Sequence, residues 1–254
     1  MRFDGKIAVV TACASGIGRA TADIMARDGA TIVGVDNNQE RLEKTVAEIG
    51  AAGGQAHGRL CNALNKDEVD RLVESIAREF GRIDILVNAV GGSTIIPRPS
   101  ATVDELALDE WKAIIDFNLD GTFLFTHAVV PVMKRQKSGK IVNLASIAGR
   151  GRSVSSSAAY AAAKGGIIAF TKKLCYELGP YGININAIAP SVTLTERIRP
   201  HWERRSQEDQ AREIDKTPLR RVAEAADQAR VICFLASSDA DFVTGVTIDV
   251  TGGG

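Results

Sequence analysis

The sequence predicts one α/β domain over residues 1–254, built on a doubly wound parallel sheet of about seven strands with helices on both faces. Two features of the pattern support this fold class. Short runs rich in Val and Ile are apolar almost throughout, as strands buried on both faces should be. Between these runs lie longer stretches with helical periodicity, several of which end in glycine. This alternation favours a parallel sheet with right-handed crossover connections.

Strands are expected at six strongly apolar runs and at one more polar segment. The strong runs cover residues 6–12, 30–36, 82–90, 140–146, 182–190 and 246–250, and the weaker segment is 55–62. The clearest helical stretches are 18–29, 39–53 and 66–81. Parallel sheets bind ligands beyond the carboxyl ends of their strands. Functional residues are therefore expected where each apolar run stops.

Residues 191–217 interrupt this alternation. The segment is polar, contains Pro200, and is too long for a simple turn. We interpret it as a lid or substrate-binding insertion. Trp202 is expected to anchor this lid, and the role of His201 stays open.

Composition excludes several function classes. Lys plus Arg (31) equals Asp plus Glu (31), so no overall field directs the chain to nucleic acid or a membrane surface. Asp4 interrupts any apolar signal sequence, and no apolar run is long enough to span a bilayer. The four cysteines are far apart and lack ligand spacing, which argues against disulfides and metal sites. We expect a cytoplasmic protein with small-molecule partners and no metal.

A glycine-containing loop follows the first expected strand. The segment 11–18 reads TACASGIG and leads into a helix, the context in which such a loop binds phosphate. Gly16 lets the backbone approach a pyrophosphate, Gly18 lets the helix pack closely on the sheet, and Ser15 offers a hydroxyl. Ala12 departs from the usual first glycine. It is expected to be tolerated if its φ angle is negative, because only a positive φ excludes a Cβ.

The second expected strand ends at Asp36. An acidic residue about 20 positions after the loop accepts hydrogen bonds from the adenosine ribose in dinucleotide-binding folds. An isolated Asp at this place would more often cap a helix or a turn. Together with the loop it favours NAD, because its carboxylate would repel the 2′-phosphate of NADP and the next residue is Asn37 rather than a basic one.

Ser146, Tyr160 and Lys164 form a candidate catalytic group. Ser146 ends a buried strand, and Tyr160 and Lys164 lie four residues apart in an alanine-rich helical segment. A Tyr–Lys pair alone is usually a surface feature, but its combination with a serine at a strand end is rarer. An ammonium near a phenol lowers the pKa of the phenol. Tyr160 could then exchange a proton with a reacting oxygen that Ser146 holds.

These motifs, in this order, resemble the short-chain dehydrogenase/reductase family over essentially the whole chain. The family's glycine motif is matched by Thr11, Gly16, Ile17 and Gly18, and its N-N-A-G motif by Asn88 and Ala89, with Gly91 following. Its catalytic residues correspond to Asn118, Ser146, Tyr160 and Lys164. Its P-G-x-x-x-T motif corresponds to Pro190 and Thr195, with Ser191 in place of glycine. The resemblance implies a Rossmann-type fold.

The resemblance also implies roles for individual residues. Lys164 would hold the nicotinamide ribose as well as assist Tyr160, and Asn118 would orient a water molecule in a proton relay. Asn88 would shape the adenine side, where Asn62 would place a neutral amide. The nicotinamide carboxamide would dock against the backbone around Val192 and Thr193. A homotetramer is implied, with long helices at 109–135 and 158–178 pairing across two-fold axes.

Three functions remain open at this point. The first is an NAD-dependent oxidoreductase acting on a secondary alcohol or ketone, with Tyr160 as general acid and base. The second is an NADPH-dependent 3-oxoacyl-thioester reductase, which Asp36 and the absence of a basic residue at position 15 disfavour. The third is a non-catalytic nucleotide-binding regulator. A regulator would not need to keep Ser146, Tyr160 and Lys164 together.

Two further hypotheses concern side chains near the expected site. Cys13 in the glycine loop is expected to serve packing rather than redox sensing. Arginines from three segments could meet at one mouth and bind an acidic substrate such as a carboxylate or a CoA thioester. The alternative is a solvated face, since acidic residues lie among those of the lid. The arginines are Arg98, Arg150, Arg152, Arg197, Arg199, Arg204 and Arg205.

Overall fold

The computed structural model describes residues 1–153 and 155–254. Its main sheet has seven parallel strands in the order β3-β2-β1-β4-β5-β6-β9. The predicted α/β fold is confirmed, including the weak strand candidate 55–62. The strands are β1 Ile7–Thr11, β2 Thr31–Asp36, β3 Gln55–Leu60, β4 Ile85–Asn88, β5 Gly139–Leu144, β6 Ile183–Pro190 and β9 Thr247–Val250.

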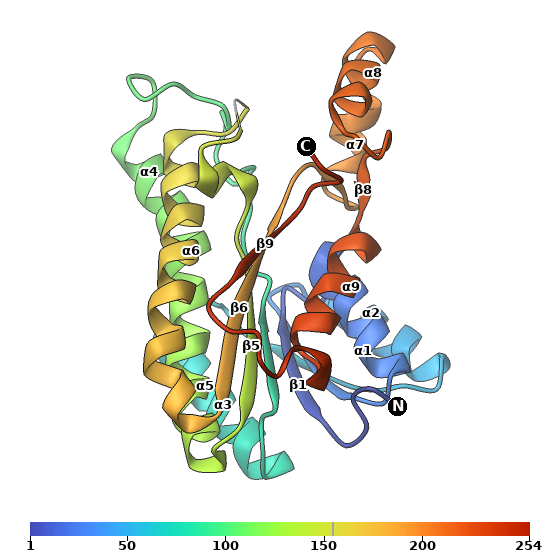
Figure 1. Cartoon of the computed structure of the whole chain (residues 1–254), viewed down its shortest axis with the longest axis vertical. Helices are drawn as coiled ribbons and strands as arrows, with labels where there is room; N and C mark the ends of the chain where they lie inside the picture. The colour runs from blue at the N-terminus through green and yellow to red at the C-terminus, as the bar shows by residue number, and fades with distance from the viewer. Residues whose placement is uncertain (154) are drawn as a thin grey trace.

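Helices cover both faces of this sheet, as Figure 1 shows. One layer contains α1 Gly16–Arg27, α2 Gln39–Ala51 and α9 Ala225–Leu235. The other contains α3 Lys66–Phe80, α4 Leu108–Ile115, α5 Gly121–Gln136 and α6 Ala158–Leu178. A π-helical turn, Asp116–Asp120, joins α4 to α5. Short 3₁₀ turns lie at Ile147–Arg150, Gly179–Tyr181 and Ser238–Ala240.

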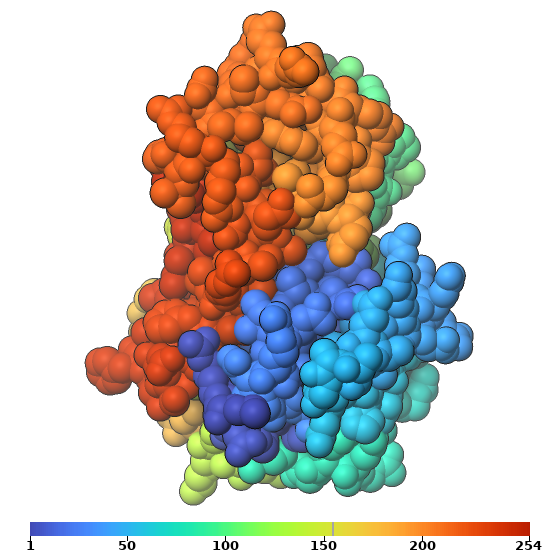
Figure 2. All heavy atoms as spheres, turned by 90° about the vertical axis from the view of Figure 1, so that its right-hand side faces the viewer, coloured from blue at the N-terminus to red at the C-terminus, as the bar shows by residue number. Residues whose placement is uncertain are grey.

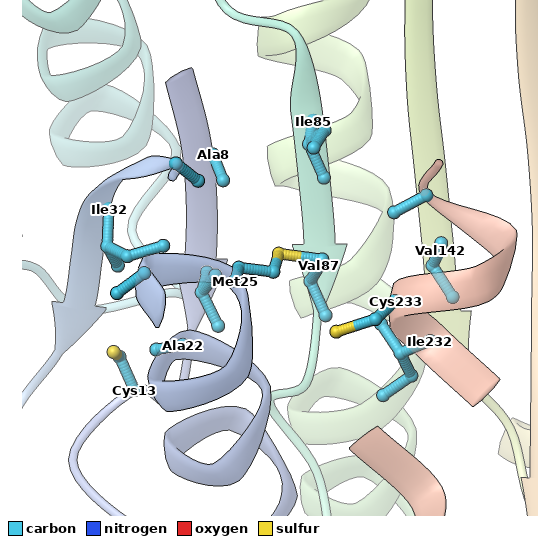
Figure 3. Close-up of a cluster of buried hydrophobic side chains, with 14 of the residues drawn as sticks. Ala8, Cys13, Ala22, Met25, Ile32, Ile85, Val87, Val142, Ile232 and Cys233 are labelled. Carbon is cyan, nitrogen blue, oxygen red and sulfur yellow. The ribbon is translucent and has the colours of Figure 1, made fainter. Parts of the chain in front are cut away.

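Strand β1 shows why its sequence is continuously apolar. Ala8 and Val10 pack into the core under α1 and α9, whose contributions include Met25 and Ile232 (Figure 3). The alternate residues Ile7 and Val9 pack into the second core, under α3, α5 and α6. Successive side chains of a strand point to opposite faces, so a strand covered on both faces needs apolar residues at every position.

The order of strands reverses direction at β1 and β4. The chain runs outward from β1 through β2 to β3, and then returns to β4 on the other side of β1. At such a switch point the loops after the two strands diverge and leave a crevice at the carboxyl edge of the sheet. The glycine loop after β1 and the 89–92 segment after β4 border this crevice.

The segment 191–217, interpreted above as a lid, lies beyond the carboxyl edge of the sheet. It contains β7 Thr193–Leu194, α7 Arg199–Glu203 and α8 Gln207–Lys216, and β7 pairs in parallel with β8 Ala223–Glu224. Figure 2 shows the lid in orange, standing above the blue N-terminal part of the chain. Trp202 is buried, as expected of an anchor. In the described part of the chain, no helix combines the length and apolar character needed to cross a bilayer.

Candidate active site

A cleft of about 930 Å³ lies at the carboxyl edge, between the strand ends and the lid. This volume is at the upper end of the range for small-molecule sites. Most of the predicted site residues line it together: Ser15, Gly16, Ile17, Gly18, Asp36, Asn62, Ala89, Gly91, Ser146, Tyr160, Lys164, Pro190, Val192, Thr193 and Thr195. Three others, Thr11, Asn88 and Asn118, are buried behind its wall.

The glycine loop begins the N-terminus of α1. Gly16 has φ +58° and its amide N–H points out of the helix end. A Cβ on Gly18 would lie 2.4 Å from the carbonyl oxygen of Ala12, so only glycine allows α1 to approach β1 this closely. The close helix–strand packing expected at Gly18 is therefore present. Free amide groups at a helix N-terminus suit an anionic ligand such as a pyrophosphate.

Ala12 corrects one expectation. Its φ is +49°, in the left-handed region, whereas tolerance of alanine had been argued from a negative φ. A Cβ in this conformation costs roughly 1–2 kcal/mol. The loop keeps the backbone path that glycine would take, and the alanine carries the strain.

Asp36 joins the glycine loop to the end of β2. Its Oδ2 accepts a hydrogen bond from the Ala14 amide at 3.0 Å, and its Oδ1 accepts one from the Asn38 amide at 3.0 Å. The turn-capping role considered for this residue is thus present, within the cleft wall. Arg41, in the first turn of α2, lines the same end of the cleft. Sequence reasoning missed it because only the residue directly after Asp36 was considered.

Thr11 and Asn88 hold the cleft wall from behind. The Thr11 hydroxyl donates to the Val87 carbonyl at 3.2 Å and accepts from the Ala89 amide at 2.9 Å, which ties β1 to the end of β4. Asn88 Nδ2 donates to Asn143 Oδ1 at 2.8 Å. Both side chains are therefore buried behind the wall rather than at its surface, where Thr11 fixes the backbone after β4 and Asn88 joins β4 to the Asn143 side chain of β5.

Asn118 clamps the loop after β4. It lies in the π-helical turn, where an extra residue per turn turns the side chain inward. Its Oδ1 accepts from the Gly92 amide at 2.9 Å, and its Nδ2 donates to the carbonyls of Gly92 at 3.1 Å and Ile114 at 2.9 Å. A Cβ on Gly91 would lie 2.6 Å from Asn118 Oδ1 and 2.9 Å from Lys164 Nζ. Asn118 and Lys164 thus meet behind Gly91.

Ser146, Tyr160 and Lys164 meet at the end of β5. Ser157 caps α6 by accepting from the Tyr160 amide, so Tyr160 and Lys164 fall in its first two turns. Lys164 is buried, and its Nζ donates to the Leu144 carbonyl at 2.8 Å. The same Nζ lies 5.7 Å from the centre of the Tyr160 ring. A strand end and a helix start therefore bring the three predicted catalytic residues together.

Burial dominates the protonation of this group. Burial, followed by the nearby Arg197 guanidinium, lowers the pKa of Lys164 to about 7. Burial raises the pKa of Tyr160, and the Ser146 hydrogen bond and the Arg197 charge only partly oppose it. The expected lowering of the Tyr160 pKa is therefore wrong for this structure, because burial outweighs the opposing effects of the Ser146 hydrogen bond and the Arg197 charge.

The segment after β6 forms the opposite wall. Pro190, Val192, Thr193 and Thr195 line the cleft, as the resemblance implied. Thr193 is held by a hydrogen bond from its Oγ1 to the Ser191 carbonyl at 3.1 Å. Thr195 lies against the glycine loop, with its Cγ2 3.2 Å from where a Cβ on Gly16 would be.

The next two residues of the lid span the cleft. Glu196 Oε2 accepts from the Gly16 amide at 2.8 Å, and Arg197 Nη2 donates to the Gly91 carbonyl at 3.2 Å. Neither was selected as a cofactor-site residue from the sequence, where both belonged to a mixed-charge stretch. Their position directly after Thr195 was the available signal.

The structure also shows the surroundings of one cysteine and the three histidines of the chain. Cys13 is buried in the core, and burial followed by the Asp36 charge raises its pKa to about 12, which agrees with a packing role. The His57 ring contacts Phe80, and the His127 ring contacts Phe123. His201 lines the cleft. Among the described residues, no group of three or more His, Cys, Asp or Glu side chains converges on a metal position.

Comparisons with known proteins identify the family to which the chain belongs. A family model described as enoyl-(acyl carrier protein) reductase matches residues 11–254. The chain is 36% identical over 253 residues to the 3-oxoacyl-[acyl-carrier-protein] reductase FabG of Thermotoga maritima, covering 100% of this chain and 99% of that protein. It is 37% identical to the (2S)-[(R)-hydroxy(phenyl)methyl]succinyl-CoA dehydrogenase subunit BbsD of Thauera aromatica, with coverage of 100% and 98%.

A solved structure extends the likeness to three dimensions. The 3-oxoacyl-[acyl-carrier protein] reductase from Brucella melitensis with bound NAD matches at a TM-score of 0.88 and 35% identity, covering 99% of this chain and 93% of that chain. Sequence and fold agree over nearly the whole length. The chain therefore belongs to the short-chain dehydrogenase/reductase family, and is an oxidoreductase of that family.

Proposed function

We propose that the protein transfers a hydride between NAD(H) and a secondary alcohol or ketone, with Tyr160 as general acid and base. The observation that carries this proposal is the meeting of Ser146, Tyr160 and Lys164 in the same cleft as the glycine loop and Asp36. A group suited to bind a nucleotide and a group suited to transfer a proton then share one cleft, which a single hydride-transfer reaction would require.

The reaction divides between cofactor and protein. A nicotinamide cofactor would supply the hydride for the carbonyl carbon, and the protein would supply the proton for the carbonyl oxygen. The raised pKa keeps the Tyr160 phenol protonated at neutral pH, so it can donate that proton when a ketone is reduced. The Ser146 hydroxyl holds the oxygen as its charge grows. Lys164, with a pKa of about 7, can return a proton to Tyr160.

The cofactor residues fit NAD. The α1 N-terminus suits a pyrophosphate, Lys164 the nicotinamide ribose, and the segment from Pro190 to Thr195 the nicotinamide. At the adenosine end the Asp36 carboxylate suits the ribose hydroxyls and opposes a 2′-phosphate. The NAD bound to the Brucella melitensis reductase supports the same assignment.

An NADPH-dependent 3-oxoacyl-thioester reductase is the second candidate. The reductase named among the relatives supports it. So does Arg41, because a guanidinium beside Asp36 would suit the 2′-phosphate of NADP. A non-catalytic regulator is less well supported, since it would not need the three reacting side chains in one cleft.

Assembly and location are further parts of the proposal. We expect a homotetramer formed through α4, α5 and α6, the segments predicted as long helices. Phe123 on α5 and Tyr176 on α6 are exposed aromatic residues that such an interface would cover. A cytoplasmic location fits four cysteines that are free thiols.

The test compares cofactors on one substrate panel. NAD and NADP are each offered with secondary alcohols, and NADH and NADPH with ketones and a 3-oxoacyl thioester, while nicotinamide absorbance is followed. We expect turnover with a preference for NAD in kcat/KM, and Asp36→Ala should narrow that preference by about tenfold or more. A wild-type preference for NADPH that Arg41→Ala removes would establish the second candidate instead.

A further inference from the structure

The seven arginines considered from the sequence separate into two groups by their contacts. Four form ion pairs within 3.4 Å with three carboxylates, one of which is shared by two arginines, and a fifth, Arg204, donates to the Pro200 carbonyl. The four ion pairs are Arg98 with Glu105, Arg150 with Asp249, Arg152 with Asp249, and Arg199 with Glu224. These five guanidinium groups serve the protein's own structure.

Arg197 and Arg205 form the second group. Both line the cleft, and among the described residues neither forms an ion pair with a carboxylate. Arg205 stacks over the Trp202 ring at 5.5 Å, at the lid end of the cleft. Arg197 reaches across to the opposite wall. The cleft therefore receives two positive charges from the lid that the described chain does not pair.

Arg197 is the closer of the two to the predicted catalytic residues. Its Nη2 donates to the Gly91 carbonyl, and both Nη atoms lie 2.6 Å from where a Cβ on Gly92 would be. Gly91 in turn lies against Lys164 Nζ. The guanidinium charge also lowers the pKa of both Tyr160 and Lys164. Gly91 therefore lies between Arg197 and Lys164, and the Arg197 charge acts on both predicted proton-transfer residues.

Within the part of the chain that the structure describes, Arg197 uses one donor of its guanidinium. A guanidinium carries five N–H groups in a planar fork that matches a carboxylate in two parallel hydrogen bonds. Among the described residues, Arg197 makes one hydrogen bond, to the Gly91 carbonyl, and the neighbouring Gly92 amide is held by Asn118. Arg197 also lines the cleft, and the carboxylate next to it in the chain, Glu196, accepts from the Gly16 amide instead.

We propose that Arg197 binds a carboxylate of the substrate close to the reacting carbon, so that the substrates are short oxo acids or the corresponding hydroxy acids. This rests on the proposed function. A carboxylate is favoured over the phosphates of a CoA ester because Arg197 lies beside the proton-transfer residues. The phosphates of CoA are separated from the thioester carbon by a long pantetheine arm.

The cofactor's pyrophosphate is the other anion expected in this cleft. Its place is the α1 N-terminus at Gly16, on the side of the cleft that Glu196 contacts, whereas Arg197 contacts the loop after β4. The two anions therefore have separate positions. A substitution of Arg197 should change selectivity between substrates and leave NADH affinity within about twofold.

The test uses three acids, each against its methyl ester: pyruvate, 3-oxobutanoate and 4-oxopentanoate. Reduction is measured with wild type, Arg197→Gln and the control Arg98→Gln, which removes an arginine that is paired with Glu105 and lies outside the cleft lining. For at least one of the acids, the kcat/KM of the wild-type protein should be about tenfold or more higher than for the matching methyl ester. Arg197→Gln should remove that preference through KM while the ester changes by less than about threefold. Arg98→Gln should retain the preference.

Binding separates this proposal from the proposed function. Calorimetric titration of the NAD⁺-loaded protein with each acid and ester reports affinity without turnover, because NAD⁺ has no hydride to transfer to a ketone. Acid binding that Arg197→Gln abolishes, without turnover of any substrate, would support the anion site and contradict the proposed function. Equal binding of acids and esters, equal effects of Arg197→Gln on both, or a loss confined to NADH affinity would overturn the role of Arg197.

Discussion

The two walls of the cleft are built in different ways. On the sheet wall, Thr11, Asn118 and Lys164 are buried, and each is held by hydrogen bonds to backbone atoms of neighbouring strands or loops. On the lid wall, Glu196 and Arg197 are exposed, and each makes one hydrogen bond to the backbone of the opposite wall. The sheet wall is thus organised before any ligand arrives.

This difference has an energetic side. Breaking a buried hydrogen-bond pair leaves an unpaired polar group, which costs about 1–3 kcal/mol. An exposed contact to one backbone group contributes roughly 1 kcal/mol or less, because water replaces it. The lid contacts can therefore be exchanged for contacts to a ligand at little cost, whereas the sheet wall holds its geometry.

Lys164→Met tests how much folding free energy the burial of the Lys164 amine in the sheet wall costs. The pKa of Lys164 is lowered from 10.5 to about 7, so between these values the unfolded chain binds a proton that the folded chain lacks. Wild-type stability should therefore rise with pH above 7, and the contribution of Lys164 should be least favourable below 7. We expect the stability of wild type relative to Lys164→Met to rise by about 1 kcal/mol per pH unit between roughly pH 7 and 8.5.

Urea unfolding of both proteins across this pH range makes the measurement. The difference between the two proteins matters more than either curve, because buried thiols such as Cys13 also titrate differently on unfolding. If the difference in unfolding free energy between the two proteins stayed constant from pH 7 to 8.5, Lys164 would have an ordinary pKa. Its burial in the sheet wall would then not disfavour the charged amine.

Glu196→Ala examines the lid wall. The Glu196 carboxylate and a pyrophosphate would compete for the Gly16 amide at the α1 N-terminus, and their charges repel. Removing the carboxylate should tighten NADH binding by about three- to tenfold, equivalent to roughly 1 kcal/mol. Fluorescence titration with NADH gives the Kd. Glu203→Ala, an exposed glutamate on α7 of the same lid, is the control and should leave the Kd unchanged. An unchanged or weaker Kd for Glu196→Ala would show that its carboxylate does not compete.

Ala12→Gly is the smallest expected change, at the start of the sheet wall. Glycine relieves the strain at φ +49° but adds conformational freedom to the unfolded chain. The net gain in stability should be about 0.5–1 kcal/mol. Denaturant midpoints measure it, with Ala14→Gly in the same loop as a control that should not stabilise. A loss of stability in Ala12→Gly would mean that the Cβ packs favourably enough to offset the strain.

The same contrast explains what could be predicted from the sequence. The strands were predictable because burial on both faces requires continuous apolar runs, and Tyr160 and Lys164 because helical spacing places them on one face. The φ angle of Ala12 was not, since one residue type is compatible with several backbone angles. The burial of Thr11 and Asn88 behind the wall required knowledge of which strands are neighbours.

The role of Arg197 could not be predicted from the sequence for a different reason. The sequence offered seven arginines with similar neighbours, and only their contacts separate the paired from the unpaired. Glu105 and Asp249 neutralise Arg98 and Arg152 across separations of 7 and 97 residues. Neither separation is a regular helical spacing, and a pair 97 residues apart leaves no local pattern, so the composition of the lid could not distinguish a binding residue from a solvated one.

The central claim is that Tyr160 carries the proton in hydride transfer, and Tyr160→Phe tests it most directly. The variant keeps the ring and removes only the hydroxyl. Turnover with NADH and a reducible ketone should fall by about 10²–10⁴-fold while the NADH Kd stays within about threefold of wild type. Tyr176→Phe, on an exposed turn of the same helix, should retain wild-type turnover. A Tyr160→Phe variant that keeps more than about a tenth of wild-type turnover would contradict the account.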